Sequence, residues 1–127
     1  MVAFALHLRM GTVKSYEDLI VWQKSVCLLE EIYTLTSAFP KSELFGLTSQ
    51  LNRSAVSIPS NIAEGFGRRS REEFKRYLKI ALGSLYELKT QVLISNRLGF
   101  INQQEMDSVE ALSLSIDKII HTILKKW

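Results

Sequence analysis

The chain has few of the residues that build covalent or metal-bound sites, with one cysteine and two histidines among its 127 residues. A single cysteine excludes an internal disulfide and a cysteine-based metal cluster. Cys27 falls inside a helical apolar pattern, which predicts a small buried residue in a reducing, cytoplasmic setting. Long apolar runs are also missing, because no stretch reaches the ~20 residues that a membrane helix needs. We therefore expect a cytoplasmic protein that does not enter a membrane.

Signatures of catalysis are equally scarce. No Glu-x-x-His pair of the kind that binds metals in helical bundles occurs, nor does a phosphate-binding loop, a dinucleotide fingerprint or a nucleophile elbow. His7 and His121 lie near opposite ends of the chain. His121 has no carboxylate three residues away on either side, which favours a surface residue over a ligand or base. The expectation is a protein that is not an enzyme and holds no metal or cofactor.

Hydrophobic periodicity predicts four helices and no strand. The first runs from about Tyr16 to Ser37, with Ser15 as its cap, and ends before Pro40. Its predicted core stripe is Leu19, Trp22, Val26, Leu29, Tyr33 and Thr36. The second runs from Ser42 to about Glu64, and Pro59 inside it predicts a kink or a break. Its stripe is Leu44, Leu47, Leu51, Ala55, Ile58 and Ile62.

The third helix has the clearest limits. Ser70 and Glu73 predict a capping box at its start, and Gly99 a C-terminal cap. Gly83 and Ser84 in its middle predict close approach by another backbone. Its stripe is Phe74, Leu78, Ala81, Leu85, Leu88 and Val92. The fourth helix begins at Asn102 with Glu105, and its stripe is Val109, Leu112, Ile116, Ile119 and Ile123.

Short connections between these helices predict an all-α, antiparallel, up-down-up-down four-helix bundle. We expect this bundle to be one domain over residues 15–127. Residues 1–14 are predicted to be an N-terminal extension or arm. Because Met10 precedes the first helix, residues 1–9 are either the product of a misplaced start or an arm that docks on a neighbour. The apolar opening has no basic region before it and no clear cleavage site, which argues against a secretory signal.

Positive charge is concentrated in the middle of the chain. Residues 53–97 contain nine of the sixteen Lys and Arg residues but four of the thirteen Asp and Glu residues, whereas the whole chain has a net charge of +3. Arg68, Arg69 and Arg71 crowd the start of the third helix, where the macrodipole disfavours each cation by ~0.3–1 kcal/mol. Cations at a helix N-terminus oppose the macrodipole without stabilising the helix, and such an unfavourable placement is typical of a functional site.

Helical spacing extends this basic region. Arg76 lies within reach of acids one turn back, which predicts an ordinary surface ion pair, but Lys79 has no acid within a turn. Arg71, Lys75 and Lys79 follow one another at intervals of four and predict a positive stripe that suits phosphate oxygens. A solvated basic face and a surface for a protein partner or for self-association remain alternatives.

The second helix carries a polar stripe of its own. Arg53, Ser57, Ser60 or Asn61, and Glu64 follow at steps of about four residues. Small polar groups in this pattern predict packing against another helix or a subunit, with Arg53 paired to an acid. A subunit contact and a plain surface are equally compatible with the pattern.

Two stretches carry a family resemblance. NRSAVSIPSNIAEGFGRRSREEFKRYLKIALGSLYELKTQV resembles the signature of the bacterial four-helix-bundle family encoded in 23S ribosomal RNA intervening sequences, and SYEDLIVWQKSVCLLEEIY resembles that family's first helix. The resemblance spans about Ser15 to Ile123. The family is similar in fold to Avd, the accessory protein of diversity-generating retroelements, which forms a five-subunit barrel, binds nucleic acid through basic residues and works with a reverse transcriptase.

That resemblance implies a ring-shaped homopentamer that binds nucleic acid. The candidate binding residues that it carries over are Arg53, Arg68, Arg69, Arg71, Lys75 and Lys79. Our hypothesis is a non-enzymatic, oligomeric protein that binds RNA, or an RNA/DNA intermediate, through the phosphate backbone. The alternative is a protein-interaction module whose basic face docks an acidic partner such as a reverse transcriptase. A third class, an enzyme that acts on RNA, lacks any candidate acid–base pair.

Overall fold

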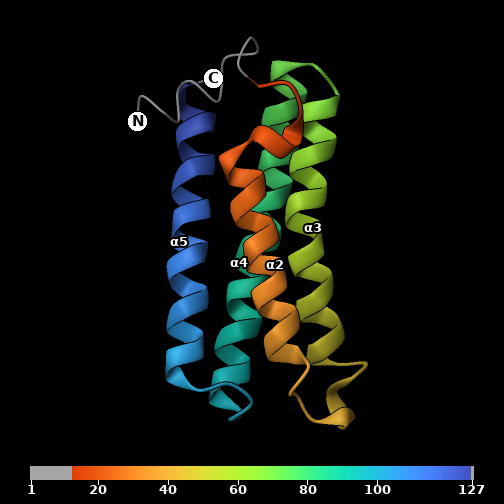
Figure 1. Cartoon of the computed structure of the whole chain (residues 1–127), viewed down its shortest axis with the longest axis vertical. Helices are drawn as coiled ribbons and strands as arrows, with labels where there is room; N and C mark the ends of the chain where they lie inside the picture. Colours follow the sequence, from red (N-terminus) through yellow and green to blue (C-terminus); the bar gives the residue numbers. More distant parts are fainter. Residues whose placement is uncertain (1–12, 127) are drawn as a thin grey trace.

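A computed structural model describes residues 13–126, which contain no strand. Its elements are two 3-10 turns, η1 (Tyr16–Asp18) and η2 (Lys41–Glu43), and four long helices, α2 (Ile20–Thr36), α3 (Leu47–Gly67), α4 (Arg71–Arg97) and α5 (Gln103–Lys126). The helices lie side by side, and the chain runs down α2, up α3, down α4 and up α5 in Figure 1. The predicted all-α class with four helices is confirmed. Most of the predicted N-terminal extension lies outside the described residues.

The core is made by apolar side chains from all four helices. The predicted stripe of α4 is confirmed, since all six of its residues are at most 3% exposed. In α5 the buried line runs through Val109, Ile116 and Ile123 as predicted, and it includes Ile120. Among the described residues no helix is long and apolar enough to cross a membrane.

The predicted stripe of α2 is wrong by one position between its ends, although Leu19 and Thr36 are buried as predicted. The buried residues are Val21, Ser25, Leu28, Ile32 and Thr36. Trp22 and Leu29 pack at the edge of the core, and Tyr33 is 48% exposed. The same rotation of about 100° per residue leaves Cys27 exposed, so the prediction that Cys27 is buried is also wrong.

A small hydroxyl residue explains this error. Ser25 is buried although it is polar, because its hydroxyl donates to the carbonyl of Trp22 at 2.7 Å. A hydrogen-bonded hydroxyl of this kind costs little to bury. The true core line of α2 therefore contains a residue that resembles a solvent-facing one in the sequence.

The helix ends also differ in part from the prediction. Ser15 forms its capping box with Asp18, but this box begins η1, and α2 starts only at Ile20. The predicted start at Ser42 is the turn η2, so Leu44 lies exposed before α3 begins. α3 is continuous through Pro59, which excludes the predicted break. Gly99 ends α4 with a φ of +82°, as predicted for a C-terminal cap.

The close approach of two backbones lies at Gly65 and not at Gly83. A methyl group added at Gly83 would meet nothing within 4 Å, whereas one at Gly65 would lie 2.5 Å from the Cβ of Tyr77. Next to Gly83, the Ser84 hydroxyl does meet α3, at 2.8 Å from the hydroxyl of Ser57. The prediction for Gly83 is therefore wrong, and the tight contact lies at the end of the bundle that carries the arginines.

Candidate nucleic-acid interface

A tight turn connects α3 to α4 and holds the first arginines. The N–H of Arg69 donates to the carbonyl of Phe66 at 3.3 Å, and Arg69 has a φ of 56°. This left-handed conformation costs a residue with a Cβ about 1 kcal/mol and is usually filled by glycine. The Ser70 side chain then accepts the N–H of Glu73 and starts α4. The turn therefore keeps a strained arginine at the positive end of a helix.

Arg68 is tied into a network between the two helices. Its guanidinium donates to the carboxylate of Glu64 at 3.0 Å and to the hydroxyl oxygen of Tyr77 at 2.8 Å. The Tyr77 hydroxyl itself donates to Glu64 at 3.0 Å. The bond from Arg68 is the main reason that the pKa of Glu64 lies below its ordinary value, with the bond from Tyr77 second. Arg68 thus stabilises the contact between α3 and α4, and a phosphate would compete with Glu64 for it.

Arg76 forms the ion pair that its spacing predicts. Its guanidinium donates twice to the carboxylate of Glu73, at 3.0 and 3.2 Å, and lowers the pKa of Glu73. The centre of the same guanidinium lies 4.6 Å from the ring centroid of Tyr77, and that of Arg68 lies 5.3 Å from it. Tyr77 therefore holds two arginines by cation–π contact.

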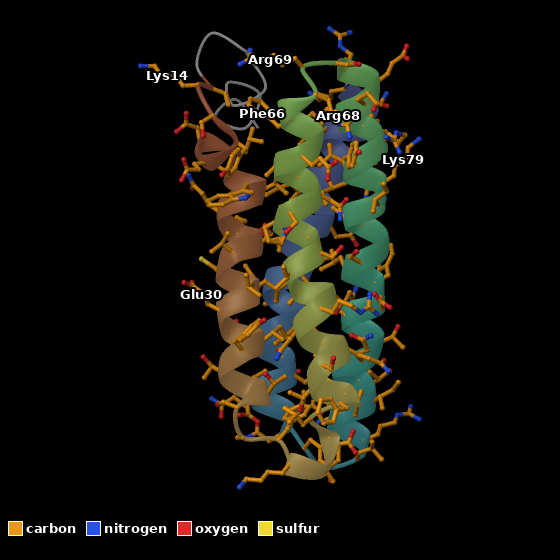
Figure 2. The ribbon with its side chains drawn as sticks, turned by 90° about the vertical axis from the view of Figure 1, so that its right-hand side faces the viewer. Lys14, Glu30, Phe66, Arg68, Arg69 and Lys79 are labelled. Atoms are coloured by element: carbon orange, nitrogen blue, oxygen red, sulfur yellow. The ribbon has the colours of Figure 1, made fainter. Side chains whose placement is uncertain are left out.

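Lys75 and Lys79 form the clearest part of the predicted stripe. Lys79 follows Lys75 by about one helical turn, and neither makes an ion pair within residues 13–126. Arg71 is exposed at the first residue of α4, on the same line. Figure 2 shows Lys79 on the outer side of α4, on the same half of the bundle as Arg68 and Arg69. We call Arg69, Arg71, Lys75 and Lys79 the basic edge.

Arg53 lies away from the basic edge. Its partner on α4, Glu87, is eight positions after Lys79, the last residue of the basic edge, or about 12 Å along the axis at 1.5 Å per residue. The Arg53 guanidinium lies 3.5 Å from the carboxylate of Glu87, which is the acidic partner predicted for it. The polar stripe of α3 meets α4 at this pair and at Ser57 with Ser84. The structure therefore does not bring Arg53 together with the other candidates.

The sequence comparison agrees with this architecture. The family model described as "23S rRNA-intervening sequence protein" matches residues 17–122. The chain belongs to this family. No curated protein matches the chain significantly.

One solved relative of this intervening-sequence protein has a similar fold. It is a protein of unknown function from the S23 ribosomal protein family of Bacteroides thetaiotaomicron, with 28% sequence identity and a TM-score of 0.78. The match covers 84% of the present chain and all of the relative. The fold is therefore shared across nearly the whole described bundle.

Sequence patterns did not predict one polar cluster between α4 and α5. Asp117 accepts the hydroxyl of Tyr86 at 3.0 Å, and its other oxygen lies 2.6 Å from Nδ1 of His121. The hydrogen bond from Tyr86 to Asp117 raises the pKa of Tyr86. The i−4 spacing from His121 to Asp117 is the signal that would have found the pair. Within the described part of the chain, no group of three or more His, Cys, Asp and Glu side chains could hold a metal ion.

Proposed function

We propose that this chain is a non-enzymatic, oligomeric protein of the cytoplasm that binds nucleic acid, RNA or an RNA/DNA intermediate, by its phosphate backbone. The observation that carries the proposal is the pair of Lys75 and Lys79, two like charges one turn apart on α4 that form no ion pair with any residue from 13 to 126. Like charges at this spacing repel by a few tenths of a kcal/mol, and phosphates would relieve the repulsion.

The neighbouring turn supports the same ligand. Arg69 adds a guanidinium next to the N-terminus of α4, where backbone N–H groups and the macrodipole favour anions. Arg71 adds a second one on the line of the two lysines. These groups bind phosphate without regard to base, so we expect binding that is largely independent of sequence and weakened by salt.

The proposal includes self-association. By its resemblance to Avd, the up-down-up-down antiparallel bundle would form a ring-shaped homopentamer and repeat the basic edge five times. The exposed apolar side chains of Phe45, Leu44 and Tyr33, of which Phe45 is 92% exposed, support contact with another copy. Light scattering should give five times the mass of the chain, and a monomer at micromolar concentration would contradict this part of the proposal.

Charge reversal tests the basic edge. Lys75→Glu with Lys79→Glu should weaken binding to an RNA hairpin at least tenfold in 0.1 M salt, with a nearly unchanged Tm. Each lost phosphate contact should also reduce the log–log salt slope by about 0.9. The matched control is Lys118→Glu with Lys125→Glu, which reverses two exposed lysines of α5.

The double reversal also separates the alternatives. RNA binding equal to that of the parent would overturn the proposed surface. Weak RNA binding by the parent itself, together with a stable complex with an acidic protein such as a reverse transcriptase, would favour the protein-interaction module instead.

A further inference from the structure

A pocket of about 550 Å³ lies where α3 leads into α4. Residues 13–16, which precede α2, line one part of it, and Phe66, Gly67 and Arg69 line the rest. Its volume is within the range of about 300–1,000 Å³ that is common for small-molecule sites. Lys14, Phe66 and Arg69 lie at this end of the bundle in Figure 2, next to the start of the basic edge.

Two aromatic rings of the pocket are held in place from the side. The Tyr16 ring, on a residue that is 38% exposed, makes an edge contact with Trp22 at 5.2 Å between centroids. The Phe66 ring makes a similar contact with Phe74 at 5.9 Å. Rings that are already fixed lose little conformational freedom when a flat ligand stacks on them. The pocket is therefore lined by two aromatic side chains whose positions are restrained.

Two cations border the same pocket. Lys14 and Arg69 both line it, and neither forms an ion pair within the described part of the chain. The segment that carries Lys14 is fixed by its backbone, because the N–H groups of Lys14 and Ser15 both donate to the carboxylate of Asp18. A pocket lined by aromatic residues and by two cations suits a flat base with its adjoining phosphates.

We infer that this pocket holds one unstacked base of a single-stranded nucleic acid, with Lys14 and Arg69 binding the adjoining phosphates. The inference rests on the proposed function, since Arg69 belongs to both the pocket and the basic edge. A base inside a duplex is paired and stacked and cannot enter without being extruded. The ligand class is therefore narrowed to single strands, loops or unpaired ends.

An abasic oligomer provides the test, because it has the phosphates of RNA without the bases. We expect the full chain to bind a twelve-residue oligoadenylate about tenfold more tightly than an abasic oligomer of the same charge. Tyr16→Leu and Phe66→Leu, which keep apolar bulk but remove the aromatic faces, should each reduce this preference without changing affinity for the abasic oligomer. Tyr86→Leu, at an exposed aromatic residue of α4 outside the pocket, is the matched control.

The cations are tested in the same way. Lys14→Gln should weaken binding of both oligomers, whereas Lys41→Gln at the exposed turn η2 should leave both unchanged. Equal affinity of the parent for the two oligomers would overturn the pocket but leave the basic edge intact. A preference that survives both Tyr16→Leu and Phe66→Leu would also overturn the pocket. Failure to bind either oligomer would overturn the proposed function as well.

Discussion

A methyl group at position 65 would lie 2.5 Å from the Cβ of Tyr77, so α3 and α4 meet at a point where only glycine fits. The hydroxyl of the same Tyr77 bonds to Glu64 and Arg68. Tyr77 therefore takes part in the close approach at Gly65, in the hydrogen bonds with Glu64 and Arg68, and in the cation–π contacts with the arginines. This arrangement fixes the distance between the two helices immediately before the turn that carries Arg69.

Gly65→Ala should destabilise the protein by about 1–3 kcal/mol, because the added methyl group must push α3 and α4 apart. Gly83→Ala is the matched control, since its methyl group would meet nothing within 4 Å. That change should stabilise the protein by up to about 1 kcal/mol through helix propensity. Urea unfolding followed by circular dichroism measures both, and an equal effect of the two substitutions would contradict the predicted contact.

Arg69→Gly should stabilise the fold by about 0.5–1 kcal/mol and weaken RNA binding, because glycine accepts a φ of 56° without strain. Arg69→Ala removes the same charge but keeps the Cβ. It should weaken binding equally without a gain in Tm. Thermal unfolding and RNA titration of both variants separate the backbone effect from the charge effect, and equal Tm values would argue against strain at this turn.

Protonation of Glu64 should destabilise the protein in acid. Its pKa is lowered by Arg68 and Tyr77, so its contribution to stability is complete above its unfolded pKa of 4.5. That contribution is lost as the pH falls through the lower pKa of the folded state. Thermal unfolding from pH 7 to pH 2.5 should show a shallower acid loss for Glu64→Gln than for the parent. Glu110→Gln, at an exposed residue of α5, should keep the parent's slope.

Ser54→Ala should cost about 1–3 kcal/mol. The Ser54 hydroxyl is buried and donates to Oε1 of Gln91 at 2.9 Å, so its loss leaves a buried amide oxygen without that donor. Ser60→Ala on the exposed side of the same helix should change stability by no more than about 0.5 kcal/mol. Chemical unfolding of the two variants gives the comparison, and equal stabilities would mean that water replaces Ser54.

Sequence patterns predicted α4 almost completely, because its apolar residues form one line and both of its ends carry strong caps. The apolar spacing of α2 predicted the wrong core stripe, because two adjacent stripes of this helix are both rich in large apolar residues. Burial of Ser25 decided between the two stripes, and this depends on a hydrogen bond that spacing does not reveal. Spacing likewise does not reveal that α3 continues through Pro59, which is buried.

The site was predictable only where one helix contains it. Lys75 and Lys79 follow from spacing along α4, and so does the pair of Arg76 with Glu73. The hydrogen bond from Arg68 to Tyr77 connects the end of α3 with α4. The pocket is lined by residues 13–16 together with residues at the end of α3 and in the turn after it. Neither arrangement has a periodic signal, because each depends on how the elements pack.

The short turn between α3 and α4 has a consequence for folding. α3 packs more extensively on α4 than any other pair of elements does, and contacts such as Glu64 with Tyr77 join residues close in sequence. Contacts between residues close in sequence form fastest, so we expect the hairpin of α3 and α4 to be the most structured part of the folding transition state. The basic turn would then be assembled before α2 and α5 close the bundle, and destabilising changes at Gly65 would act mainly on the folding rate.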